Sequence, residues 1–120
     1  MYTDFASHVF AIVDKADAAG FAALFAPDGR FVFGNAEAIQ GPAAIEEGTA
    51  AFFAGIRSLR HEIVNQWEVG ADTVVELAVE YHRLTDDFVT VPGVTIFTRD
   101  DTGLITHYRI YVDLAPLFAA

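Results

Sequence analysis

The final apolar stretch of the chain carries the side chains best suited to proton transfer. Alternate residues of a strand point to opposite sides, and one of its two sides would present Ile105, His107, Arg109, Tyr111 and Asp113. If this side lines a cavity, burial raises the pKa of the Asp113 carboxyl toward neutrality, where it acts as acid and base. We therefore assign proton transfer to Asp113, assisted by His107. Tyr111 or Arg109 would then orient the substrate.

Two earlier stretches with the same alternation carry further polar candidates. In the stretch 73–84, Glu80 is the second candidate to assist Asp113. Polar residues in this stretch fit the solvent-exposed face of a sheet equally well. In the stretch 61–69, His61, Asn65 and Trp67 share one side. We expect these three side chains to contact a substrate, with His61 at the mouth of the cavity.

Aromatic residues supply an apolar wall for such a cavity. The chain holds 11 phenylalanines among 120 residues, and most of them must belong to the core. We expect part of this set to contact a ligand, namely Phe31, Phe33, Phe53 and Phe97. Such a wall favours a hydrophobic, cyclic ligand over a sugar or a nucleotide.

Helices are predicted in the first half of the chain. Apolar residues at helical spacing predict a helix over 4–15, with Thr3 as its N-cap. Asp17 caps a second, shorter helix, which the turn residues 27–29 end before a strand over 30–33. Pro42 follows Gly41 and suits the first position of a third helix.

After about residue 60 the period changes to that of strands. Four strands are predicted over 61–69, 73–84, 88–98 and 104–113, joined by turns of hairpin length into an antiparallel meander. Pro92 and Gly93 interrupt the third of them and predict a bulge or bend that curves the sheet. Helices followed by such a sheet give a single α+β domain over residues 1–120. A one-residue slip in the last strand would exchange the side of Asp113 for that of Val112.

Charge and composition exclude several kinds of partner. With 17 acidic and 7 basic residues the net charge is −10, so nucleic acid and anionic membrane surfaces are repelled. The chain has no cysteine, its four histidines lack metal-site spacing, and it has no phosphate-binding glycine loop. We therefore expect no metal and no cofactor. No apolar run is long enough to span a bilayer and no basic leader is present, so a cytoplasmic location is expected.

Three segments resemble one known family. They are Ala22–Gly29, Gly41–Ile45 and Ile110–Leu117, and together they are similar to the SnoaL-like branch of the nuclear transport factor 2-like superfamily. The resemblance implies a cone in which three N-terminal helices pack into a strongly curved antiparallel sheet around an apolar pocket. The superfamily includes polyketide cyclases, ketosteroid isomerases, limonene-epoxide hydrolases, dehydratases and proteins that only bind, so the fold alone does not choose an activity.

The resemblance distinguishes between these activities at particular positions. The isomerase base and oxyanion-hole tyrosine would fall near Phe33 and Val9, which cannot transfer a proton, so this activity is disfavoured. In the epoxide hydrolases and the cyclases an aspartate on the last strand acts as acid and base, and Asp113 matches it. Glu80 is a possible match for the hydrolases' second acid, but Ala78 stands where they have an arginine.

These observations lead to a first hypothesis and two alternatives. The first is a cofactor-independent enzyme that performs acid/base chemistry of cyclase, isomerase or epoxide-hydrolase type on a hydrophobic, cyclic substrate. The second is a protein that binds a hydrophobic ligand without catalysis, and the third is a structural association domain. Because the apolar and aromatic sheet needs cover, we expect a homodimer through its outer face.

Overall fold

Three helices form in the N-terminal half, as the spacing predicts. The computed structural model describes residues 4–118. The helices are α1 (Phe5–Asp14), α2 (Ala18–Ala22) and α3 (Pro42–Ala54), and a short α4 (Ala115–Phe118), which was not predicted, follows the sheet. None of the described helices is long and apolar enough to cross a membrane.

The helix starts follow from short-range capping. Asp4 caps α1, since its side chain accepts a hydrogen bond from the backbone N–H of Ser7 at 2.8 Å. The expected cap, Thr3, lies outside the described residues. Asp17 caps α2 as predicted and accepts from the N–H of Gly20 at 2.9 Å. Pro42 occupies the first turn of α3, where its missing N–H costs no hydrogen bond.

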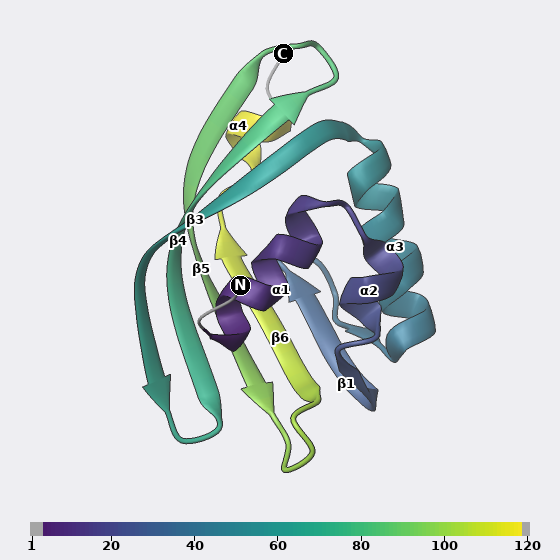
Figure 1. The fold of residues 1–120 in the computed structure, drawn as a ribbon. Coiled ribbons are helices and arrows are strands. Elements are labelled where there is room, and N and C mark those ends of the chain that lie inside the picture. The colour runs from purple at the N-terminus through teal and green to yellow at the C-terminus, as the bar shows by residue number, and fades with distance from the viewer. Residues whose placement is uncertain (1–3, 119–120) are drawn as a thin grey trace.

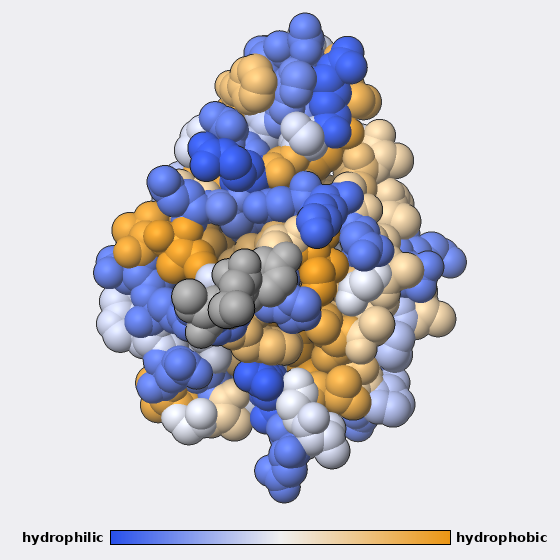
Figure 2. Space-filling view, in the orientation of Figure 1, coloured by the Kyte–Doolittle hydropathy of each residue, from blue (hydrophilic) through white to orange (hydrophobic). Residues whose placement is uncertain are grey.

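Helix α3 is covered on one side only. Its fully buried residues are Ile45 and Thr49, whereas its outer surface is rich in exposed alanines. Figure 2 shows this surface as the pale apolar flank on the right of the view. Alanine has the highest intrinsic helix propensity, so α3 can form with a narrow buried stripe. That stripe continues into the half-buried Phe52 and Phe53.

Six strands form one curved sheet that wraps around α1 and α2 (Figure 1). They are β1 (Phe25–Phe33), β2 (Ile39–Gln40), β3 (Ile56–Val69), β4 (Asp72–Arg83), β5 (Phe88–Arg99) and β6 (Ile105–Val112). Their order is β2-β1-β6-β5-β4-β3. Strands β3 to β6 form the predicted antiparallel meander, and β1 joins β6 in parallel. The α+β class and the curved sheet are therefore confirmed.

The irregular positions of the sheet differ from those predicted. Residues 27–29 form no separate turn, because they lie within β1, where the register with β6 shifts between Phe25 and Arg30. The ladder between β4 and β5 runs through Pro92 without a shift, so the predicted bulge is absent there. The ladder between β5 and β6 begins at Gly93, and Pro92 therefore needs no N–H toward β6.

The true bulges of the meander lie mainly in β3. This strand begins at Ile56, five residues earlier than expected, because residues 56–60 already pair with β4. Its register with β4 shifts between Ile56 and Ser58 and again between Ile63 and Asn65. A bulge turns the side chains that follow it to the other face of the sheet.

Aromatic rings fill the core between the helices and the sheet. Phe21 from α2 is 2% exposed, and its ring lies edge-on to Phe25, Phe31 and Tyr108 with centroids 5.1, 5.7 and 5.1 Å away. Phe97 is fully buried and stacks on Tyr108. This aromatic cluster joins α2 to β1, β5 and β6.

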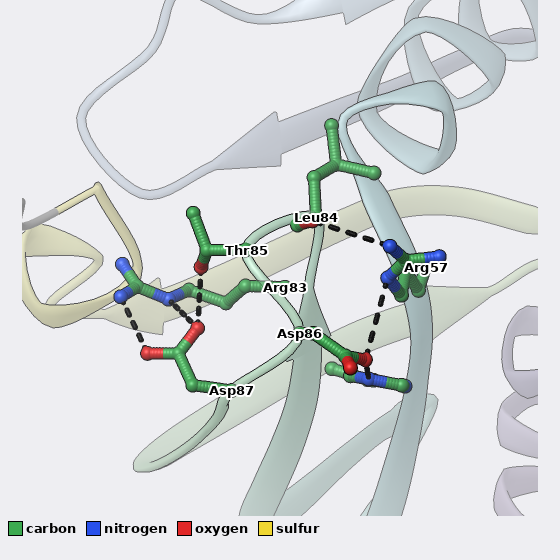
Figure 3. A network of polar contacts seen from close by, with 7 residues as sticks. Arg57, Arg83, Leu84, Thr85, Asp86 and Asp87 are labelled. Carbon is green, nitrogen blue, oxygen red and sulfur yellow. Dashed lines mark hydrogen bonds and ion pairs between the residues drawn. The ribbon is translucent and has the colours of Figure 1, made fainter.

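A polar network closes the turn between β4 and β5. Figure 3 shows its members: Arg57, Arg83, Leu84, Thr85, Asp86 and Asp87. Arg83 binds the Asp87 carboxylate through Nε and Nη2 at 2.9 and 2.6 Å, and its Nη1 donates to the carbonyl of Leu117 in α4 at 3.1 Å. Hydrogen bonds from Arg83 and then Thr85 hold the pKa of Asp87 well below its usual range. The network therefore ties α4 and the start of β3 to this end of the sheet.

Candidate functional site

A cavity of about 220 Å³ lies between the helices and the inner face of the sheet. Its wall is mostly apolar and comes from α1, α2, α3 and all six strands. The apolar part is formed by Val13, Phe21, Phe31, Phe33, Ala36, Ile39, Phe52, Phe53, Leu59, Leu77, Val79, Val94, Ile110 and Val112. The polar side chains on the wall are Thr49, His61, Tyr81, Thr95 and Tyr108. No Asp, Glu, Lys or Arg among residues 4–118 lines it.

His61 brings a titratable ring to this wall and is held there by Asp14. The Nδ1 atom of His61 lies 2.6 Å from Oδ1 of Asp14, and the backbone N–H of His61 donates to Oδ2 at 3.0 Å. The His61 side chain is 11% exposed and the Asp14 side chain 24%. Phe10 stacks on the imidazole with a centroid distance of 4.8 Å. Two hydrogen bonds and one stacked ring therefore fix the position of the imidazole.

The geometry also fixes the proton of this ring. An ionised carboxylate only accepts hydrogen bonds, so Nδ1 must be the donor, and in the neutral ring Nε2 then carries the lone pair. No hydrogen bond joins Nε2 to another of the described residues. An imidazole with an oriented Nδ1–H and an unengaged Nε2 can accept a proton from a bound molecule and return it.

The hydroxyl groups on the wall differ in their partners. Thr49 Oγ1 donates to the carbonyl of Ile45 at 2.8 Å. The Tyr108 hydroxyl is hydrogen-bonded to Thr95, and burial raises the pKa of this phenol well above its usual range. Burial also raises the pKa of Tyr81 to about 12. Both phenols are therefore protonated at neutral pH.

Comparison with known proteins places this architecture in a family. The model of the SnoaL-like domain family matches residues 6–108. The chain belongs to the SnoaL-like family. No curated protein sequence matches it significantly. The assignment agrees with the resemblance in the three sequence segments and with the cone-shaped fold.

Solved structures share the fold of this SnoaL-like chain at low sequence identity. A hypothetical protein with a ketosteroid isomerase-like fold from Catenulispora acidiphila, in complex with trimethylamine, is 19% identical with a TM-score of 0.87, covering 97% of this chain and 90% of that one. A protein from Jannaschia sp. CCS1 that is provisionally described as a SnoaL-like polyketide cyclase is 22% identical with a TM-score of 0.76. The match covers 96% of this chain and 92% of that one. SalBIII, an epoxide hydrolase/cyclase-like enzyme with a role in pyran ring formation in salinomycin, is 18% identical with a TM-score of 0.79, covering 92% and 89%.

Four of the residues predicted from the sequence lie on the cavity wall of this SnoaL-like domain. They are Phe31, Phe33, Phe53 and His61. Phe97 is buried behind the wall, between Phe5 and Tyr108. The sequence patterns predicted no role in the site for Asp14 or Tyr81. The apolar alternation of Val75, Leu77 and Val79 with Tyr81 was the available signal for Tyr81, because these four side chains share the buried face of β4.

The expected face of β6 is the outer one from His107 onward, whereas Ile105, expected on the same face, is fully buried because the register shifts between Thr98 and Arg99. Tyr108, Ile110 and Val112 point to the cavity, while His107, Arg109, Tyr111 and Asp113 do not line it. The inner set buries apolar surface, whereas turning the other set inward would bury charged groups at a cost in free energy. The Asp113 side chain is exposed and accepts from the backbone N–H of Ala115 at 3.0 Å, where it starts α4.

The remaining predicted residues lie on the outer side of the sheet. Glu80 forms an ion pair with Arg60 at 3.8 Å. Asn65 donates to Glu76 at 2.9 Å, and Trp67 is 51% exposed. The register shift between Ile63 and Asn65 explains this, because it turns Asn65 and Trp67 to the face opposite His61. No three or more of the described His, Asp and Glu side chains group as metal ligands.

Proposed function

We propose that the cavity binds a neutral, hydrophobic, cyclic small molecule and that His61 with Asp14 performs acid/base chemistry on it without a cofactor. The observation that carries this proposal is the His61 imidazole, held by a carboxylate at 2.6 Å on a wall that is otherwise apolar. Among the charged or titratable side chains that were candidates from the sequence, only His61 meets the cavity.

The proposed mechanism uses each contact of the dyad. Asp14 holds the imidazole with its proton on Nδ1, so that the lone pair of Nε2 faces the bound molecule and accepts its proton. The imidazolium that forms is stabilised by the Asp14 carboxylate, which stays ionised. His61 then returns the proton at a second atom or to a leaving oxygen. Isomerisation, ring closure and epoxide opening all need such a transfer.

The size and charge of the cavity narrow the ligand. An apolar cavity of about 150 Å³ holds a benzene molecule, so about 220 Å³ admits a substituted single ring. A charged ligand would find no opposite charge on the wall apart from the dyad and would lose its hydration. The proposal is consistent with the ring-forming role of the epoxide hydrolase/cyclase-like relative.

A thermal-shift screen tests ligand binding directly. Cyclic ketones, epoxides, lactones and aromatic polyketide fragments are offered to the wild type and to two variants of neighbouring residues. A ligand at 100 times its Kd stabilises the fold by about 2.7 kcal/mol, which is seen as a higher Tm. Val79→Phe places a ring in the cavity and should abolish the shift, whereas Ala78→Phe on the outer face should preserve it. Compounds that bind are then assayed for turnover.

The opposite outcome favours one of the alternative functions. If no compound raises the Tm of the wild type, the cavity does not serve small molecules and an association domain is favoured. If compounds bind but none is converted, the chain is a binding protein.

We further propose that a second copy of the chain covers the outer sheet face. Trp67 and Tyr111 are 51% and 54% exposed there, and Nε of Arg109 is buried without a hydrogen-bond partner among the described residues. Burial and the charges of Arg109 and Arg30 lower the pKa of His107. Arg30 and Arg109 make the part of this face at β1 and β6 basic. In a two-fold related copy this basic part can lie against the acidic part of the face at β4.

Light scattering tests the dimer. It should give twice 13.1 kDa for the wild type and a lower mass for Arg109→Glu. A monomeric wild type would contradict the dimer.

A further inference from the structure

Tyr81 carries the one hydroxyl on the cavity wall that the described residues leave without a hydrogen bond. Thr49 bonds to the carbonyl of Ile45, and Tyr108 and Thr95 bond to each other. Tyr81 is 3% exposed, and no hydrogen bond links its hydroxyl to any of residues 4–118. Its ring is held by Phe52, whose centroid lies 6.1 Å away at an interplanar angle of 78°.

The unpartnered hydroxyl belongs to the cavity wall rather than to the packed interior, since Nε of Arg109 is the one fully buried side-chain polar atom without a partner among the described residues. Its hydrogen-bond partner must therefore be a water molecule or a ligand in the cavity. Phenylalanine would fill nearly the same volume at this position without needing such a partner. The hydroxyl therefore needs an acceptor from outside the chain, and since the pKa of Tyr81 is raised to about 12, it is available as a donor.

The strand register places Tyr81 beside the dyad. In the ladder of β3 and β4, Leu59 is opposite Tyr81 and His61 is opposite Val79. His61 and Tyr81 are therefore diagonal neighbours on the same face, which places their Cβ atoms about 7–8 Å apart or somewhat less. A ring bound in the cavity can contact both side chains at once.

We propose that Tyr81 donates a hydrogen bond to an oxygen atom of the ligand and so orients it toward His61. This inference rests on the proposed function and narrows its substrate class to neutral cyclic compounds that carry a carbonyl or ether oxygen. Tyr81 selects the compound and sets its orientation, and His61 moves the proton.

The test uses two probes of equal shape and one matched control variant. Acetophenone presents a carbonyl oxygen where α-methylstyrene presents a methylene group. Tyr81→Phe should weaken acetophenone binding by about 10-fold, the effect of losing one hydrogen bond, and leave α-methylstyrene unchanged. Tyr108→Phe, which removes a hydroxyl paired with Thr95, should keep the wild-type ratio of the two affinities. Calorimetric titration gives both dissociation constants.

The Tm without ligand provides a readout independent of the probes. Tyr81→Phe should melt at the same temperature as the wild type or a few degrees higher, whereas Tyr108→Phe should melt lower. If both probes bind but the affinity ratio is unaltered in Tyr81→Phe, or if this variant melts lower, the assignment of Tyr81 is overturned and the proposed function stands. If neither probe binds the wild type, the cavity does not take a ring and both proposals fall.

Discussion

Replacing His61 with glutamine is expected to lower turnover of a bound substrate by about 100- to 10,000-fold, the usual contribution of a general acid and base. The ring is held by Asp14 at 2.6 Å, so Asp14→Asn should lower turnover by at least about 100-fold as well, because an amide can stabilise the wrong tautomer. The measurement is kcat/KM for a compound found in the ligand screen. The affinity for the substrate should change far less than kcat in both variants.

The controls for this prediction are the carboxylates that the sequence favours. Asp113 and Glu80 do not line the cavity, so Asp113→Asn and Glu80→Gln should keep turnover within about two-fold of the wild type. A large loss of kcat/KM in Asp113→Asn together with an unchanged kcat/KM in His61→Gln would contradict the role of the dyad. It would show instead that Asp113, next to the end of β6, transfers the proton.

Truncation of Phe21 is expected to have the largest effect on stability. Its ring is 2% exposed and lies against Phe25, Phe31 and Tyr108. Phe21→Ala should therefore lower the free energy of unfolding by about 3–5 kcal/mol, a large part of the 5–15 kcal/mol that is typical of a domain. Urea denaturation measures the change through the transition midpoint at constant m-value.

Phe118 provides the matched control for this substitution. It is the same residue type but 72% exposed at the end of α4, so Phe118→Ala should change the unfolding free energy by less than about 0.5 kcal/mol. A loss below about 1 kcal/mol in Phe21→Ala would show that the aromatic cluster is not the tightly packed core described above.

Local patterns predicted the elements of the fold well. The α1 periodicity, the Asp17 cap and the Pro42 start each depend on residues within one or two helical turns. The meander followed from the alternation and the short turns. The bulge between Ile63 and Asn65 has no such signal, because neither glycine nor proline lies there. The predicted side of the sheet was therefore wrong for Asn65 and Trp67.

The site depends on contacts that local pattern cannot give. Asp14 and His61 are 47 residues apart, and their contact requires the end of α1 to meet the edge strand β3. On β6 the polar side carries the residue types that can transfer protons, but burial favours the opposite side with Tyr108, Ile110 and Val112. From His107 onward the alternation separated the two faces correctly but could not say which of them is inside, and it placed the buried Ile105 on the wrong face because of the register shift before His107.

The tautomer of His61 is the most direct test of the Asp14–His61 dyad, since its measurement requires no substrate. Two-bond proton–nitrogen correlation spectra distinguish the protonated from the bare ring nitrogen, and the His61 signals are identified by their loss in His61→Gln. With the ring neutral, we expect a proton on Nδ1 and a bare Nε2, a pattern that Asp14→Asn should alter. A proton on Nε2 in the wild type would mean that Asp14 does not hold the ring for proton transfer and would contradict the proposed role of the dyad.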